Sequence, residues 1–173
     1  MGESTIFAAM RTLFLIRHAK SSWDYPGLRD FNRPLNDRGM HDAPLMGQLL
    51  AKQGFIPDLL VSSPAKRAIT TALFFAEAFH IDVDAVQEEQ DIYEASSADI
   101  MRVVSRLPDS AQIVLLFGHN PTLTDVTNRF SEKFIDNVPT CGIVQIESDA
   151  DSWQGFDDSN ASVKRCFFPK ELL

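Results

Sequence analysis

Two histidines and two arginines each stand just beyond a stretch of sequence that we expect to form a buried strand. The four residues are Arg17, His18, Arg67 and His119, and the stretches are Thr12 to Ile16, Asp58 to Val61 and Gln112 to Phe117. Parallel strands end at the same edge of a sheet, and ligands of open α/β sheets bind beyond those carboxyl ends. We therefore expect the four side chains to lie together at one edge.

The chemistry that these residue types suit is the binding of a phosphate dianion. Arg17 and Arg67 can each hold phosphate oxygens with two parallel N–H groups. Arg67 is expected in the first turn of a helix, where a cation opposes the helix dipole unless an anion sits beside it. Helix starts at Pro64 and Pro121 would offer backbone N–H groups to the same anion.

Other catalytic patterns fail on spacing. A cysteine phosphatase needs an arginine six residues after its cysteine, but Cys141 leads to Glu147 and Cys166 leads to Leu172. The chain has no Walker A loop and no Gly-x-Ser-x-Gly elbow. The four histidines have no short metal-ligand spacing, so we expect no metal site.

Apolar runs alternate with helical patterns along the chain, which predicts an α/β fold with a mostly parallel sheet between two layers of helices. Expected helices run from an N-cap at Asn36 to about Gln53, from a cap at Ser63 followed by Pro64 to about His80, from Ser97 to Leu107, and onward from Pro121. A short strand is expected within Asp84 to Asp91, and closing strands at Cys141 to Ile146 and Val163 to Phe168.

Bulk properties limit the partners and the compartment. The chain has 173 residues and a net charge of −8, which argues against nucleic acid and anionic membrane as partners. Residues 1–10 are interpreted as an N-terminal extension, either added or preceding a start at Met10, and 11–173 as a single domain. Cys141 and Cys166 are expected to be reduced core thiols, and the expected compartment is the cytoplasm.

Three motifs resemble those of the histidine phosphatase superfamily, also called the phosphoglycerate mutase-like superfamily. They are Leu15-Ile16-Arg17-His18-Ala19-Lys20-Ser21, Ser62-Ser63-Pro64-Ala65-Lys66-Arg67-Ala68 and Gly118-His119-Asn120-Pro121. Their order and strand context agree over about residues 11 to 147. The short length, Arg-His-Ala in place of Arg-His-Gly, and the run Arg33-Pro34-Leu35-Asn36-Asp37-Arg38-Gly39 are similar to the SixA-type phosphohistidine phosphatases.

The resemblance implies a phosphoglycerate mutase-like α/β/α sandwich in which His18 is the nucleophile. Arg17, Arg67 and His119 would bind the phosphoryl group and stabilise its charge. Water would then hydrolyse the phosphohistidine, without a metal or an organic cofactor. An imidazole with a pKa near 6.5 is largely neutral at pH 7, so it can attack phosphorus without a dedicated base.

Three functions stay open at this point. The first is a metal-independent phosphatase for phosphohistidine in a protein, the second a phosphomonoesterase for a small metabolite, and the third a phosphate-recognition module without turnover. An alkoxide leaving group needs an acid, for which Glu94 is the candidate, whereas imidazole leaves with less help. The resemblance also implies that Ser21 and Trp23 lie in a substrate loop, with Arg33 beside the phosphate or a partner.

Overall fold

The computed structural model describes residues 10–173, in which a six-stranded sheet forms the central layer. The strands are β1 (Arg11–Arg17), β2 (Leu59–Ser62), β3 (Gln87–Glu88), β4 (Ile113–Gly118), β5 (Ile143–Ser148) and β6 (Ala161–Phe167), in the order β3-β2-β4-β1-β5-β6. Among these strands only β5 runs against the others. The expectation for residues 1–10 lies, apart from Met10, outside the described residues.

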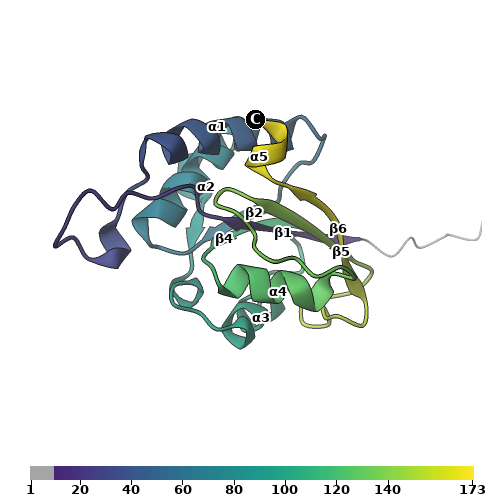
Figure 1. Cartoon of the computed structure of the whole chain (residues 1–173). Helices are drawn as coiled ribbons and strands as arrows, with labels where there is room; N and C mark the ends of the chain where they lie inside the picture. The colour runs from purple at the N-terminus through teal and green to yellow at the C-terminus, as the bar shows by residue number, and fades with distance from the viewer. Residues whose placement is uncertain (1–9) are drawn as a thin grey trace, which may run out of the picture.

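Helices cover both faces of the sheet (Figure 1), as the alternating pattern predicts. They are α1 (Asp37–Ala51) and α2 (Lys66–Ala78) on one face, α3 (Ser97–Ser105) and α4 (Thr122–Phe130) on the other, and the short α5 (Pro169–Leu172) beside α1. The expected three-layer α/β/α sandwich is therefore confirmed. None of the helices in residues 10–173 is long and apolar enough to cross a membrane.

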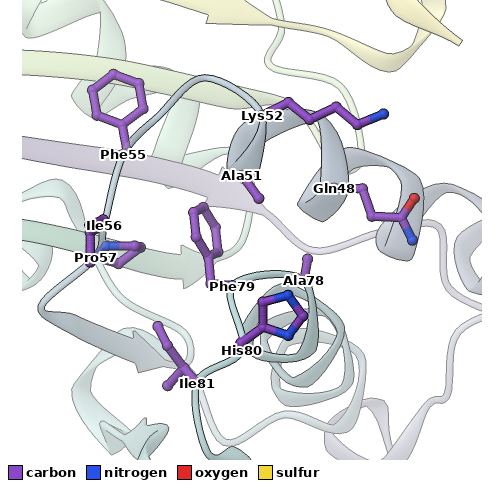
Figure 2. Close-up of a pocket in the computed structure, with 10 residues that line it drawn as sticks. All are labelled: Gln48, Ala51, Lys52, Phe55, Ile56, Pro57, Ala78, Phe79, His80 and Ile81. Carbon is purple, nitrogen blue, oxygen red and sulfur yellow. The ribbon is translucent and has the colours of Figure 1, made fainter.

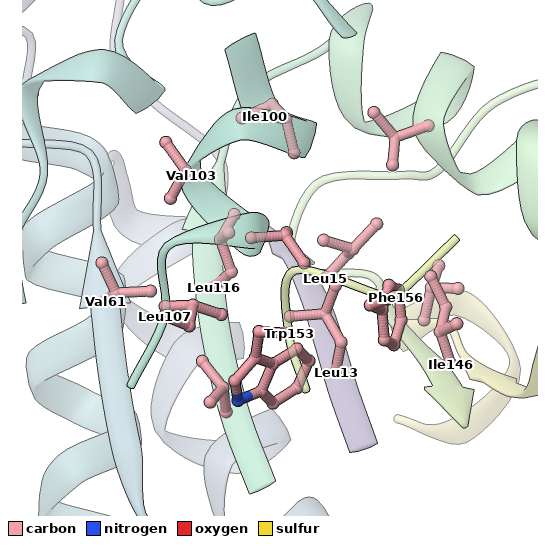
Figure 3. Close-up of a cluster of buried hydrophobic side chains, with 14 of the residues drawn as sticks. Leu13, Leu15, Val61, Ile100, Val103, Leu107, Leu116, Ile146, Trp153 and Phe156 are labelled. Atoms are coloured by element: carbon pink, nitrogen blue, oxygen red, sulfur yellow. The ribbon is translucent and has the colours of Figure 1, made fainter. Parts of the chain in front are cut away.

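The central strand β1 is buried on both faces, and its side chains alternate between two separate hydrophobic cores. Leu13 and Leu15 point into the core under α3 and α4, where they join Trp153 (Figure 3). Phe14 and Ile16 point into the core under α1 and α2. Because successive side chains of a strand point to opposite faces, the unbroken apolar run from Leu13 to Ile16 is what a central strand requires.

Most predicted boundaries shift by one or two residues, as for β5, which begins at Ile143 rather than Cys141, and two predicted elements differ more clearly. The helix expected from Ser63-Pro64 begins at Lys66, because the Ser63 hydroxyl accepts a hydrogen bond from the Ala65 N–H and the intervening chain stays outside the helix. The strand expected within Asp84 to Asp91 shrinks to β3, with a 3₁₀ turn on each side of it.

The start of α1 is packed directly against the chain that leaves β1. Asn36 caps the helix, since its side-chain oxygen accepts a hydrogen bond from the Gly39 N–H at 2.9 Å. The Asn36 N–H in turn donates to the Lys20 carbonyl at 2.9 Å. A Cβ atom at Gly39 would lie 2.2 Å from that carbonyl oxygen, so only glycine fits. This contact positions the segment immediately after His18.

Replacing Gly39 by alanine should therefore destabilise the protein, because the clash is with backbone atoms that cannot rotate away. We expect a loss of about 1–3 kcal/mol in the free energy of unfolding, measured by urea denaturation. Gly155→Ala is the matched control, since its new Cβ would meet only ordinary contacts at 3.5 Å or more. Equal unfolding midpoints for the two variants would contradict this packing.

Candidate active site

The four residues singled out in the sequence converge at the carboxyl edge of the sheet. β1 and β4 are parallel neighbours in which Arg17 lies opposite Gly118. His18 and His119 are the next residues of the two strands, so they leave the sheet at the same level. The His18 N–H donates to the Gly118 carbonyl at 3.0 Å, and the two imidazole rings lie 5.2 Å apart between centroids. The expected convergence of the histidines is therefore confirmed by the strand pairing.

His18 is buried, and its backbone neighbour determines which ring nitrogen carries the proton. Nδ1 lies 2.7 Å from the carbonyl oxygen of Ala19. A carbonyl oxygen only accepts hydrogen bonds, so Nδ1 must carry the hydrogen and donate it. In the neutral ring Nε2 then keeps a free lone pair, which is the form that a nitrogen nucleophile needs.

His119 is held through Ser63, the residue that sequence reasoning took for a helix cap. Its Nε2 lies 2.8 Å from the Ser63 hydroxyl oxygen. Its Nδ1 is buried without a hydrogen-bond partner among residues 10–173. A buried lone pair without a partner costs less than a buried N–H without one, so we assign the hydrogen to Nε2. His119 therefore presents an N–H donor on the Ser63 side of its ring.

Burial and neighbouring cations keep both rings neutral. Burial lowers the pKa of His18 to about 3, although the bond to Ala19 opposes this. Positive charge nearby lowers it further, from His119 when that ring is protonated and from Arg67 and Arg17. Burial, followed by the charge of Arg67, lowers the pKa of His119 to about 4, against the opposing effect of Asp30. A neutral His18 among fixed positive charges is the arrangement expected of a nucleophile that attacks an anion.

The two arginines are fixed by different partners. Arg17 donates from Nη1 to the Val138 carbonyl at 3.0 Å, while its buried Nε has no partner among the described residues. Arg67, at the start of α2, donates to both the backbone oxygen and the carboxylate of Asp30, at 2.7 and 3.0 Å. Both guanidinium groups are thereby oriented while N–H groups remain for a ligand.

Asp30 and Tyr93 are site residues that sequence reasoning missed. The Tyr93 hydroxyl donates to the Asp30 carboxylate at 2.8 Å, and its ring meets that of His119 edge to face, with centroids 5.7 Å apart. Asp30 belongs to a 3₁₀ turn, Asp30–Asn32, within a loop that has no periodic pattern. The only available signal was an acidic residue three positions before Arg33, which is too common to single out.

The loop after His18 is closed by Arg33, for which the sequence suggested a role near the phosphate or a partner. Its Nη2 donates to the Ser21 hydroxyl at 2.5 Å, and its Nε donates to the Ser22 carbonyl at 3.1 Å. Its guanidinium carbon lies 3.4 Å from the ring centroid of Trp23, whose side chain is exposed. The observed contacts of Arg33 are thus within its own loop, while Trp23 faces solvent.

Two cavities differ in their relation to the four predicted site residues, of which only His119 lines either one. A cavity of about 290 Å³ beside His119 is also lined by Glu94, so the candidate acid opens onto the same space as the histidine. A cavity of about 400 Å³ lies between the ends of α1 and α2 (Figure 2), where Lys52 and His80 are among its lining residues. None of the four predicted site residues lines that second cavity, so it is separate from the site.

The fold and the site together define an α/β protein that gathers two arginines and two neutral histidines at the carboxyl edge of its sheet. Within residues 10–173 no group of three or more His, Cys, Asp or Glu side chains is placed to hold a metal ion. Such an edge suits the binding of a phosphoryl group and its transfer to nitrogen.

Comparison with known proteins identifies the family. Residues 13–100 match the model of the histidine phosphatase superfamily, branch 1. An uncharacterised chloroplast protein of Arabidopsis thaliana is 30% identical over 157 residues, which cover 83% of this chain and 69% of that protein. The chain belongs to the histidine phosphatase superfamily and is a hydrolase of the phosphatase class.

Two further relatives are named for an activity. A solved structure assigned as the phosphohistidine phosphatase SixA of Agrobacterium tumefaciens is similar with a TM-score of 0.76 and 28% identity, covering 91% of this chain and 97% of that one. Phosphoserine phosphatase 1 of Hydrogenobacter thermophilus is 41% identical over 78 residues, 43% of this chain and 35% of that protein. Similarity to a phosphohistidine phosphatase thus spans nearly the whole chain.

Both site histidines should stay neutral under mildly acidic conditions, because their pKa values of about 3 and about 4 lie below the ordinary value of 6.5. Nitrogen-detected NMR of the imidazole rings at about pH 5.5 should show His18 as the neutral Nδ1–H tautomer. Titration of His18 near its ordinary pKa would contradict the burial argument.

The same pKa shifts make the protein less stable in acid. Above about pH 6.5 both histidines are neutral in the folded and the unfolded chain, so they contribute nothing to the pH dependence. As the pH falls from there towards about 4, only the unfolded chain takes up these protons. The free energy of unfolding should then fall by up to about 1.4 kcal/mol per pH unit for each histidine.

Proposed function

We propose that the chain hydrolyses phosphoryl groups through a covalent intermediate on Nε2 of His18. The observation that carries this proposal is the hydrogen bond from Nδ1 to the Ala19 carbonyl, which leaves Nε2 as the free lone pair. That lone pair attacks phosphorus, a P–N bond forms, and the leaving group departs with the electrons of its bond to phosphorus. Water then attacks phosphorus, the P–N bond breaks, and inorganic phosphate is released with His18 neutral again.

The surrounding residues are assigned to bind the transferred phosphoryl group and to stabilise its negative charge. Arg17 and Arg67 bind its oxygens, and the Nε2–H of His119 exchanges the Ser63 hydroxyl for an oxygen that gains charge as the bond to the leaving group breaks. The two guanidinium groups are already fixed by Val138 and Asp30, so the reorganisation needed is mainly the exchange of partner at His119. The proposal assigns no step to a metal ion, because these residues provide the positive charge.

We infer phosphohistidine in a protein as the substrate. Similarity to the Agrobacterium phosphohistidine phosphatase along nearly the whole chain supports this inference. The leaving group supports it as well, since an imidazole departs without the strong acid that an alkoxide requires. Cys141 and Cys166 are both free thiols, which agrees with the cytoplasm as the compartment of such a partner.

A phosphomonoester of a small metabolite is the second candidate. Glu94 and His119 line one cavity of about 290 Å³, which is large enough for a small leaving group beside His119. The phosphoserine phosphatase of Hydrogenobacter, which matches 43% of this chain, is a relative named for a phosphomonoester, phosphoserine. If the substrate is a phosphomonoester, Glu94 protonates the departing alkoxide.

Replacing His18 by alanine should abolish phosphate release, because no other residue in the proposal forms the P–N bond. We expect a loss of about 10³-fold or more in kcat/KM for an aryl phosphate and for a phosphohistidine protein. His41→Ala is the matched control, since this exposed histidine of α1 should leave the rate within about twofold of wild type. Undiminished hydrolysis by His18→Ala would refute the proposed nucleophile.

The two substrate classes are separated by Glu94→Gln, with Glu88→Gln as the control carboxylate on exposed β3. If Glu94 is the general acid, kcat for an alkyl phosphate should fall by about 10²-fold or more, while phosphohistidine hydrolysis changes little. Release of phosphate is measured for both substrates at equal protein concentration. Faster turnover of alkyl phosphate than of phosphohistidine by wild type would favour the metabolite reading.

A further inference from the structure

Asp30 joins three segments of the chain at the edge of the proposed site. Its Oδ2 accepts hydrogen bonds from Nη2 of Arg67 at 3.0 Å and from the Tyr93 hydroxyl at 2.8 Å. Its Oδ1 accepts from Nη1 of Arg33 at 3.0 Å, and its backbone oxygen accepts from Nη1 of Arg67 at 2.7 Å. One residue of a short 3₁₀ turn therefore holds the start of α2, the segment after β3 and the loop after β1.

The partners of Asp30 are themselves in contact with the reacting part of the site. The Arg67 side chain is only 8% exposed and lies near enough to lower the pKa values of both histidines. The ring of Tyr93 packs edge to face on the imidazole of His119. Asp30 itself is 51% exposed, and the hydrogen-bond partners of the two histidine rings are Ala19 and Ser63 rather than Asp30.

We propose that Asp30 is a positioning residue that orients Arg67 and Tyr93 for phosphoryl transfer at His18; this inference rests on the proposed function. A guanidinium group is a rigid plane with five N–H donors. Two of its N–H groups bind Asp30, on adjacent Nη atoms, so the rotation of the plane is fixed while the remaining donors stay available for phosphate oxygens. The hydrogen bond from the Tyr93 hydroxyl to Asp30 likewise fixes the aromatic ring that packs against His119.

Asp30 stays ionised over the whole range in which a phosphatase works. Partial burial alone would raise the pKa of its carboxyl group, but the hydrogen bonds from Tyr93, Arg33 and Arg67 outweigh this effect and lower the pKa to about 2. The orientation of Arg67 is therefore constant with pH. A carboxylate beside Arg67 also offsets the positive charge that Arg67 and Arg17 bring to the site when no anion is bound.

A positioning role and a structural role predict different consequences. Removing the carboxylate leaves the buried guanidinium groups of Arg67 and Arg33 without their anionic partner, so the melting temperature should fall in either case. A purely structural role predicts a normal kcat/KM in the protein that stays folded. Misplacing a group that binds the transferred phosphoryl is far more costly, because the reaction depends on alignment within a fraction of an ångström. Asp30→Ala should therefore lower kcat/KM for an aryl phosphate about 10–100-fold, as the loss of residues that orient reactive groups does elsewhere.

Matched variants separate charge from alignment. Asp24→Ala removes an exposed carboxylate of the same loop that forms no ion pair among residues 10–173, and it should match wild type in kcat/KM. Asp30→Asn keeps one acceptor oxygen but loses the charge, so its activity should lie between wild type and Asp30→Ala. Should Asp30→Ala fail to fold, Asp30→Asn provides the same comparison.

A double-mutant cycle with Arg67 tests whether Asp30 acts through it. Binding of inorganic phosphate, measured by calorimetry, needs no turnover and can be followed in all four proteins of the cycle. Asp30→Ala should weaken phosphate binding in wild type but change it by no more than about twofold in the Arg67→Ala background. An equal loss in both backgrounds, or a loss of kcat/KM no larger than that of Asp24→Ala, would overturn the inference. Inactive wild-type protein would instead overturn the proposed function.

Discussion

The parallel pairing of β1 with β4 is the constraint on which the catalytic geometry depends. Because Arg17 lies opposite Gly118, the residue that follows each strand is a histidine at the same level of the sheet. The pairing continues one step beyond the strands through the bond from the His18 N–H to the Gly118 carbonyl. Two imidazoles contributed from positions a hundred residues apart are thereby held with their ring centroids 5.2 Å apart.

The electrostatics of the site follow from this geometry. A buried imidazole beside two guanidinium groups is costly to protonate, so the cations that attract a phosphate also keep the nucleophile neutral. The protein carries a net charge of −8, so this attraction is local rather than a property of the whole surface. Asp30 limits the excess of positive charge at the edge while it orients Arg67.

The part of the site that could be predicted from the sequence consists of residues directly attached to strands. His18 and His119 were found because a buried strand is a strong pattern and parallel strands end together. The role of Ser63 was missed, because it looked like a helix cap and its bond to His119 joins two distant segments. Asp30 and Tyr93 were missed for the same reason: loop conformation and side-chain pairing across loops leave no periodic trace in the sequence.

The central claim is that Nε2 of His18 receives the phosphoryl group, and the direct measurement is the position of a trapped phosphate. The protein is mixed with a ³²P-labelled phosphodonor, quenched in alkali, digested, and its phosphohistidine isomer is determined by chromatography against standards. We predict label on Nε2 of His18, because Nδ1 carries the hydrogen that is bonded to the Ala19 carbonyl oxygen. Label on Nδ1, or on any residue other than His18, would contradict it.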